Sequence, residues 1–268
     1  MIIQAFRSII FYTLFILNTA IVAIILGVFS IFKKRGWYWF GWQIAKYWGF
    51  STLFLLRIIV GIKSNIIGQE NIPKGGCIIA AKHQSDWDIF AIFPLVTRPS
   101  FIAKKQLLNI PFFGWAARDF DTISIDRKKG SKAIPEMIEE AKRAINNGCR
   151  IIIYPEGTRK APLADIDYKY GIAKMYEQLN VPVVPVALNS GLFWPRNSPI
   201  LWPGTAKAEF LPPIPAGLTP EEMHKQMSEI IEKHTNKLIL QAEKQGITCP
   251  ISAELHKKLE VLKTEKLD

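Results

Sequence analysis

The sequence predicts an α/β domain preceded by a hairpin of two apolar helices. Beyond Ile62, short apolar runs alternate with helical patterns, which is typical of an α/β fold. Before that point, residues 8–32 carry no formal charge. Hydrophobic residues make up 49% of the chain, and the mean hydropathy is slightly above zero. A soluble domain of 268 residues usually has a lower hydropathy, so we expect part of the apolar surface to face lipid.

Residues 8–32 are long enough to cross a bilayer. As a helix, these twenty-five residues extend ~37 Å, against ~30 Å for the hydrocarbon core. A cleaved signal peptide is the alternative. However, the apolar run is too long, and the basic Lys33-Lys34-Arg35 follows it in place of a small-residue cleavage site. We expect this basic triplet on the cytoplasmic side.

An aromatic segment follows the first helix. Eight of the fourteen residues 37–50 are aromatic, which is typical of a membrane–water interface. Lys46 and Arg57 interrupt the apolar stretch that continues to Ile62, so we expect the second helix to lie near the interface. The first helix then spans the bilayer or enters one leaflet. Residues 1–62 are therefore predicted to form a membrane-associated helical hairpin, with a buried helix pair in a soluble core as the alternative.

The remaining chain contains clear signals for strands and helices. Six apolar runs are predicted to form strands: 76–81, 100–103, 122–125, 150–154, 181–188 and 206–211. Apolar residues recur at helical spacing over 134–145, where Ser131 can cap a helix and Asn147-Gly148 can end it. A capping box at Thr219 begins a further helix.

A proline-rich segment, residues 211–220, marks a boundary between domains. We predict three parts: the hairpin (1–62), an α/β domain (63–215), and a helical tail that packs on the catalytic domain (216–268). The chain shows no internal repeat and no low-complexity linker.

The charge balance favours an anionic partner. Lys and Arg number 34 against 23 Asp and Glu, a net charge of +11. Anionic lipid, a phosphorylated substrate and nucleic acid all fit this charge. The basic residues lie beside apolar segments and form no stripe, so we expect no nucleic acid as a partner. The three cysteines form no CxxC pair, which indicates a reducing compartment.

His83 and Asp88 are the first candidates for chemistry. An imidazole titrates near neutral pH, and a carboxylate on its other nitrogen fixes its tautomer and stabilises the imidazolium. His83 follows a predicted strand and Asp88 falls in the first turn of the next helix, so the two can come within hydrogen-bond distance. Asp86 is a competitor that we predict to cap this helix. The alternative is a solvated loop with a helix cap.

Two further stretches end predicted strands with polar residues. The run 123–125 leads into Asp126-Arg127 and three lysines, and Arg binds phosphate bidentately at such strand ends. Residues 154–159 read Tyr-Pro-Glu-Gly-Thr-Arg. There, Gly157 lets backbone N–H groups approach an anion, and Glu156 could bind a hydroxyl or position Arg159. A structural ion pair and a plain β-turn, respectively, are the alternatives.

The stretch Val181-Pro-Val-Val-Pro-Val-Ala-Leu188 contains two prolines in one apolar run. Neither proline can donate to a strand ladder, so we predict an edge strand or the wall of an apolar channel. Packing in the core is the alternative.

Taken together and in this order, these stretches resemble the 1-acyl-glycerol-3-phosphate acyltransferase family. The family pattern is His-x4-Asp, an apolar strand ending in Asp-Arg, Pro-Glu-Gly-Thr-Arg, and Val-Pro-hydrophobic-hydrophobic-Pro-Val. It matches His83–Asp88, Ile125–Arg127, Pro155–Arg159 and Val181–Val186, and residues 101–115 resemble the family's segment between its first two motifs. Asp121, Ser124, Gln106 and Lys160 depart from the usual pattern, and these departures concern the acceptor pocket.

The resemblance implies a glycerolipid acyltransferase-type fold, in which helices flank a mixed sheet. It also implies transfer of a fatty acyl group from acyl-CoA or acyl-carrier protein to the sn-2 hydroxyl of lysophosphatidic acid, giving phosphatidic acid. His83 then acts as general base, worth ~10²–10⁴ in rate, and Asp88 orients it. The remaining implied substrate-binding residues are Lys104, Arg127, Glu156, Gly157, Thr158 and Arg159. A thioester is already activated, so we expect no metal and no cofactor beyond the acyl carrier.

Because the acceptor and product are lipids, we expect the protein at the inner (cytoplasmic) membrane, on an anionic phospholipid surface, with its site facing the cytoplasm. The hairpin and residues 181–188 are then expected to line an acyl groove. Three alternatives remain. The acceptor could be another lysolipid, such as lyso-ornithine lipid or a lysophospholipid. The chain could be a phosphohydrolase with a metal at His83, Asp86 and Asp88, or a lipid-binding protein without catalysis.

Overall fold

The computed structural model describes residues 1–31 and 37–264, apart from the side chains of Trp37, Tyr38, Arg127 and Ser131. The triplet Lys33-Lys34-Arg35, expected on the cytoplasmic side, lies outside the described residues. The helices are α1 (Ile2–Ile31), α2 (Trp37–Leu55), α3 (Trp87–Ile92), α4 (Phe113–Asp119), α5 (Ile134–Asn146), α6 (Gly171–Leu179), α7 (Pro220–Gln245) and α8 (Ala253–Thr264). A π-helical turn, Leu56–Val60, extends α2.

The described residues form one seven-stranded mixed sheet, as the resemblance implied. Its strands are β1 (Ile62–Ile67), β2 (Ile78–Ala81), β3 (Pro99–Lys104), β4 (Ile123–Ile125), β5 (Arg150–Ile153), β6 (Val183–Leu188) and β7 (Gly204–Phe210). The order across the sheet is β1-β7-β6-β2-β5-β3-β4, and all pairs are parallel except β6–β7. The carboxyl-terminal ends of the parallel strands β2 to β6 therefore all lie at the same end of the sheet.

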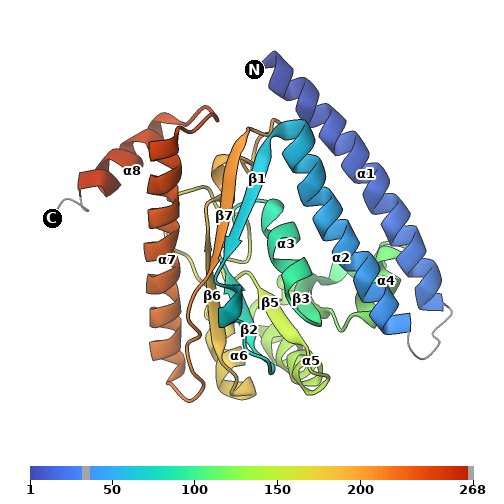
Figure 1. Ribbon diagram of the computed structural model, residues 1–268. Coiled ribbons are helices and arrows are strands. Elements are labelled where there is room, and N and C mark those ends of the chain that lie inside the picture. The colour runs from blue at the N-terminus through green and yellow to red at the C-terminus, as the bar shows by residue number, and fades with distance from the viewer. Residues whose placement is uncertain (32–36, 265–268) are drawn as a thin grey trace.

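Both faces of the sheet are covered, which explains why its central strands read as unbroken apolar runs. In β2, Ile79 and Ala81 face a core shared with α3 and the hairpin, whereas Ile78 and Ala80 face a core shared with α5, α6 and α7. Figure 1 shows the hairpin on one side of the sheet and α7 on the other.

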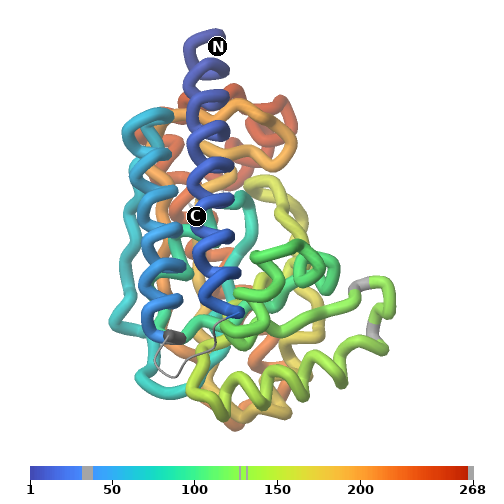
Figure 2. Tube along the Cα trace, turned by 90° about the vertical axis from the view of Figure 1, so that its right-hand side faces the viewer, coloured from blue at the N-terminus to red at the C-terminus, as the bar shows by residue number. Residues whose placement is uncertain are grey.

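The hairpin of α1 and α2 was predicted correctly as a pair of packed helices. Polar side chains join them, because Asn18 Nδ2 donates to Ser51 Oγ at 3.0 Å and Trp48 Nε1 donates to Thr19 Oγ1 at 2.9 Å. In Figure 2, α1 runs down the face of the molecule that is turned toward the viewer, with its C-terminal half beside α4. Among the described helices, α1 alone is long and apolar enough to cross a membrane.

The outer face of the hairpin is apolar and exposed. It is formed by large side chains that point away from the sheet domain, among them Phe6, Ile9, Ile16, Leu17, Ile21, Ile24, Trp39, Phe40, Phe50 and Phe54. Leu107, Ile110, Phe113 and Trp115, in and around α4, add further exposed apolar side chains. A helix pair buried in a soluble core, which was the alternative, does not leave so much apolar surface exposed.

Two strand predictions need correction. Residues 62–67 form β1 at the sheet edge, and this strand was not predicted because it follows the π-helical turn directly and has mostly exposed side chains. The stretch 181–188 was predicted to be an edge strand or the wall of an apolar channel, but β6 lies in the middle of the sheet and is buried, as in the alternative of core packing. Its Pro185 is tolerated there because it lies one residue before the β6–β7 ladder, which begins at Val186.

The two best-signalled helices are confirmed. Helix α7 begins with the capping box at Thr219, whose side chain accepts from Glu222 N at 3.2 Å. Helix α5 has a proline in its first turn and ends before Gly148, as expected. Its predicted cap, Ser131, has a side chain outside the described atoms.

Candidate active site

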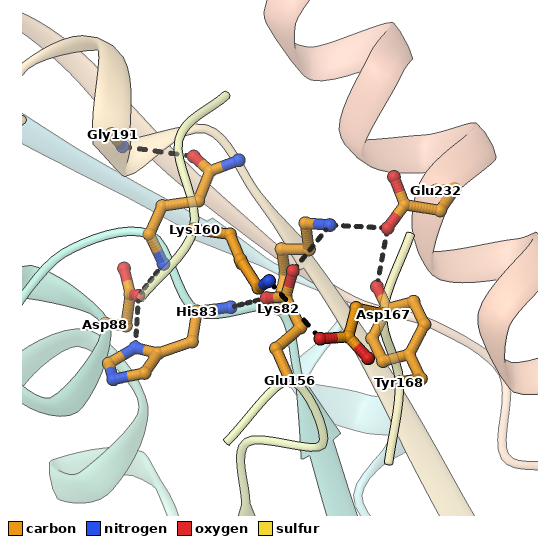
Figure 3. Close-up of polar contacts among 10 residues, drawn as sticks. Lys82, His83, Asp88, Glu156, Lys160, Asp167, Tyr168, Gly191 and Glu232 are labelled. Carbon is orange, nitrogen blue, oxygen red and sulfur yellow. Dashed lines mark hydrogen bonds and ion pairs between the residues drawn. The ribbon is translucent and has the colours of Figure 1, made fainter. Parts of the chain in front are cut away.

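The structure brings His83 and Asp88 together at the carboxyl end of β2. Asp88 lies in the first turn of α3, and its Oδ2 is 3.0 Å from His83 Nδ1 (Figure 3). The Asp88 side chain is fully buried, whereas that of His83 is 15% exposed. A carboxylate can only accept, so the hydrogen sits on Nδ1, and Nε2 presents its lone pair on the far side of the ring. This geometry can take a proton from a hydroxyl placed at Nε2.

A set of donors fixes the Asp88 carboxylate. Its Oδ2 accepts from the backbone N–H of Gln84 at 2.7 Å and of Ser85 at 3.0 Å. Its Oδ1 accepts from Ser85 Oγ at 3.2 Å and from Ser190 Oγ, which arrives from beyond β6. Burying a carboxylate is costly unless it is hydrogen-bonded. The loop 83–88 therefore wraps round Asp88 and compensates its burial.

Asp86 does not cap α3, contrary to the prediction. Its Oδ2 instead accepts from Arg159 Nη1 at 2.8 Å, while the N–H of Ile89 donates to the backbone carbonyl oxygen of Asp86 at 3.2 Å. The side chains of Arg159 and Asp86 are 33% and 44% exposed. Burial raises the pKa of Asp86, and the nearby Arg159 opposes this rise. Both groups therefore stand at the rim of the site, within reach of solvent.

Tyr154, at the end of β5, covers one face of the His83 ring. The two rings stack with centroids 4.1 Å apart and planes inclined by 23°. In the part of the chain that the structure describes, the buried Tyr154 hydroxyl has no hydrogen-bond partner. Burial raises the pKa of Tyr154 well above its usual value, so the hydroxyl keeps its hydrogen.

Glu156 is turned inward, which differs from the predicted role in binding substrate or positioning Arg159. Its carboxylate is buried, accepts from His83 N at 2.9 Å and forms an ion pair with Lys82 at 3.0 Å. Gly157 has the predicted left-handed conformation, with φ of 68°. Its N–H donates to Tyr154 O at 2.9 Å and closes the turn, whereas the sequence predicted that backbone N–H groups here could face an anion.

The other predicted site residues lie at the same end of the sheet, at or after the carboxyl ends of neighbouring strands. Lys104 ends β3 and is exposed, paired in register with Ile125 at the end of β4. Arg127 begins the 3-10 turn that follows β4, but its side chain lies outside the described atoms. Thr158 is exposed on the loop after β5. Strand β5 thus separates Lys104 from the strand that leads to His83, and β5 and β3 together separate Arg127 from it.

Comparisons with known proteins show the family of this chain. A family model described as Acyltransferase matches residues 63–189. The 1-acyl-sn-glycerol-3-phosphate acyltransferase of Pseudomonas aeruginosa is 31% identical over 220 residues, which cover 80% of this chain and 82% of the relative. The chain belongs to the 1-acyl-sn-glycerol-3-phosphate acyltransferase family.

More distant relatives of this acyltransferase extend the likeness. The human 1-acyl-sn-glycerol-3-phosphate acyltransferase alpha is 29% identical over 175 residues, covering 64% of this chain and 62% of the relative. The crystal structure of the 1-acyl-sn-glycerophosphate (LPA) acyltransferase PlsC from Thermotoga maritima superposes with a TM-score of 0.74 at 24% identity. It covers 88% of this chain and 97% of that one. This structural likeness shows that the fold is shared.

Several residues of this acyltransferase site were missed by the sequence analysis. Ser190 follows a buried strand as part of Asn189-Ser190-Gly191, and a polar cluster at a strand end is a signal that could have found it. Tyr154 was noted only as part of a motif. Lys82 and its partner Glu232 were not considered, because 150 positions separate them and no local pattern connects them.

The described residues of the acyltransferase contain no group of three or more His, Cys, Asp or Glu side chains arranged to hold a metal ion. Asp86 and Asp88 are drawn in different directions, one to Arg159 and one to His83. Of these two carboxylates, it is Asp88 that contacts the His83 imidazole.

Proposed function

We propose that the protein transfers a fatty acyl group from acyl-CoA or acyl-carrier protein to the sn-2 hydroxyl of 1-acyl-glycerol-3-phosphate, giving phosphatidic acid. The observation that carries the proposal is the His83–Asp88 contact at the carboxyl end of β2, in a chain that matches the Acyltransferase family model. The activities for which the Pseudomonas aeruginosa and human relatives are named support the choice of acceptor.

In the proposed reaction, His83 Nε2 takes the proton of the acceptor hydroxyl as its oxygen attacks the thioester carbonyl carbon. Asp88 stabilises the imidazolium that forms. The tetrahedral intermediate then collapses, the C–S bond breaks, and the imidazolium returns its proton to the departing thiolate. The products are the ester and a free thiol, with no covalent acyl-enzyme.

Arg159 is the proposed ligand of the acceptor phosphate nearest to His83. It already binds a carboxylate, Asp86, through one guanidinium nitrogen, Nη1, and both side chains are partly exposed. A phosphate can add to the remaining N–H donors or replace Asp86, since Arg binds both anions in the same forked geometry. Lys104 and Arg127 are proposed to contribute from the ends of β3 and β4.

The exposed apolar face of α1 and α2 is the proposed contact with lipid, at the cytoplasmic face of the inner membrane. Anionic lipid headgroups suit the net charge of +11. Tyr12 of α1 lies within electrostatic reach of Asp86 and Arg159, and its ring centroid is 6.1 Å from that of Trp194. The helix that meets the lipid therefore also borders the site, which favours entry of a lipid acceptor from the bilayer.

We propose that residues 1–62 anchor the protein, that residues 63–215 carry the chemistry, and that the tail, residues 216–268, supports the catalytic domain. The packing of α7 along β6 supports the role of the tail.

The proposal is tested with purified protein in vesicles, labelled lysophosphatidic acid and either acyl-CoA or acyl-carrier protein, reading phosphatidic acid and free thiol. His83→Ala is expected to lose most of the ~10²–10⁴-fold contribution of a general base. His256→Ala, an exposed histidine on α8, is the matched control. Near-native activity of His83→Ala refutes the assignment. Faster acylation of a lyso-ornithine lipid or a lysophospholipid in the same assay refutes the acceptor but retains the chemistry.

A further inference from the structure

We propose that Glu232, on helix α7, is a positioning residue for His83 and acts through Lys82 and Glu156. The inference rests on the proposed function, because it takes His83 as the base. Glu232 Oε1 accepts from Lys82 Nζ at 2.5 Å, and Lys82 Nζ lies 3.0 Å from Glu156 Oε1. Glu156 Oε2 in turn accepts from His83 N at 2.9 Å (Figure 3). A chain of charged contacts thus joins helix α7 to the backbone of the base.

Lys82 is the centre of this chain. Its side chain is buried, and its ammonium lies between the carboxylates of Glu232 and Glu156 and 5.3 Å from the centre of the Tyr168 ring. A buried charge that loses one of its partners is costly, so the ammonium holds both carboxylates. Its position between them depends on the attraction by Glu232 on one side balancing the attraction by Glu156 on the other.

Glu232 is itself held firmly. The Tyr168 hydroxyl donates to its Oε1 at 2.7 Å, and the adjacent Ile231 is fully buried in the core between α7 and the sheet. Burial raises the pKa of Tyr168, so this hydroxyl keeps its hydrogen and remains a donor. The chain of contacts is therefore anchored on α7, a helix packed against the sheet.

The other end of the chain fixes the peptide groups of His83. Its N–H bonds to Glu156, and its carbonyl oxygen accepts from Lys160 N at 2.8 Å. Burial raises the pKa of Glu156, whereas Lys82 lowers it, so Lys82 favours the ionised acceptor that faces His83 N. If Glu232 no longer holds Lys82, the Lys82 ammonium shifts, and both the position and the charge of the Glu156 carboxylate change. The His83 backbone, which is bonded to Glu156 through its N–H, then moves as well.

Other charges near Glu232 must be allowed for in the test. Its side chain is 13% exposed and borders a groove of about 700 Å³ between α8 and the loop before α6. The groove also presents Asp165, Glu254, Lys257 and Lys258. These groups are shared by every variant compared below, so they do not affect differences between variants.

The decisive experiment compares Glu232→Gln with Glu229→Gln, which removes the same charge from an exposed position of α7. The amide that Glu232→Gln introduces keeps an oxygen that can accept from Lys82 and Tyr168, so the fold is retained. We expect kcat of Glu232→Gln to fall about tenfold, since small misplacements of a reacting group are costly. We expect KM for the lysolipid to stay within about twofold, because Glu232 does not touch the acceptor. Glu229→Gln should behave as the native protein.

The pH profile separates positioning from a structural role. Removing a negative charge from this buried chain of contacts makes protonation of His83 less favourable. The acid limb of the kcat/KM profile should therefore shift to lower pH by about half a unit. Tyr168→Phe leaves all charges in place. It should lower kcat about threefold, the loss expected from one hydrogen bond, with the acid limb unchanged.

Native kcat in Glu232→Gln overturns the inference, and so does a lowered kcat with an unmoved acid limb and a matching loss of thermal stability. If Glu232→Gln does not accumulate, Tyr168→Phe decides, and native kcat in that variant overturns the inference. These outcomes are distinct from failure of the proposed function. An active His83→Ala removes the base assignment, whereas an inactive His83→Ala beside a native-like Glu232→Gln removes only the role of Glu232.

Discussion

Replacing Asp88 with asparagine tests the role of the carboxylate with the smallest change in shape. The three N–H groups that face Oδ2 belong to His83, Gln84 and Ser85, so the amide oxygen must take that position. The amide nitrogen then faces the hydroxyls of Ser85 and Ser190, which can rotate to accept. The variant should therefore fold and keep the His83 tautomer, and should lose only the negative charge.

The cost of losing this charge follows from the distance. With His83 Nδ1 and Asp88 Oδ2 3.0 Å apart, the centres of the two charges are about 5 Å apart. At an effective dielectric constant of about 20, their attraction is about 3 kcal/mol, which is present once the imidazolium forms. A loss of about 3 kcal/mol in the transition state lowers kcat/KM roughly 150-fold.

The assay is acyl transfer to labelled lysophosphatidic acid in vesicles, with thermal unfolding measured on the same preparation. Asp119→Asn, a partly exposed aspartate on α4, controls for the substitution itself. A loss below about fivefold in Asp88→Asn with an intact melting temperature refutes the reasoning, because it leaves at most about 1 kcal/mol for the charge.

Three further outcomes are expected. Arg159→Ala should raise KM for the lysolipid about tenfold with a smaller change in kcat, since one charge-assisted phosphate contact is lost, and Arg143→Ala on the exposed side of α5 should not. Thr219→Ala should lower stability by about 1 kcal/mol, or the melting temperature by about 2 °C, without changing activity, whereas Thr219→Ser should retain the cap. Burial raises the pKa of Cys77 and Cys149 to about 11, so at pH 8 only about a thousandth of either thiol is ionised and both should resist alkylation until the protein is unfolded.

Each of these three is checked by a contrary result. Unchanged kinetics in Arg159→Ala would place the phosphate elsewhere. An unchanged melting temperature in Thr219→Ala would make the cap irrelevant to folding. Rapid alkylation of Cys77 in the native protein would contradict its burial in the hydrophobic core.

Local signals were enough to predict much of the fold and the centre of the site. The capping box at Thr219 and the spacing of His83 and Asp88 each depend on residues less than a turn or two apart, where the chain itself limits the geometry. The predictions that failed depended on neighbours distant in sequence. Asp86 was expected to cap a helix because Arg159 was not known to lie beside it.

The position of β6 and the role of Glu156 failed for the same reason. Nothing in the stretch 181–188 announces that β7 will pair with it on one side and β2 on the other. Likewise, Glu156 reads as a surface turn residue until Lys82 and the His83 backbone are placed next to it. Buried polar networks are specified by tertiary packing, and one sequence read locally does not contain their pairings.

The first helix does more than lie at a lipid surface. Its Phe11 is fully buried, its Gln4 side chain donates to Val60 O at 3.1 Å, and its Ser8 hydroxyl accepts from Leu201 N at 2.9 Å. Removing the residues before β1 would therefore expose part of the hydrophobic core. The remaining catalytic domain would not be an independent, active enzyme. A protease that severs the tether should destroy activity rather than liberate it, and truncation is a poor route to a water-soluble form.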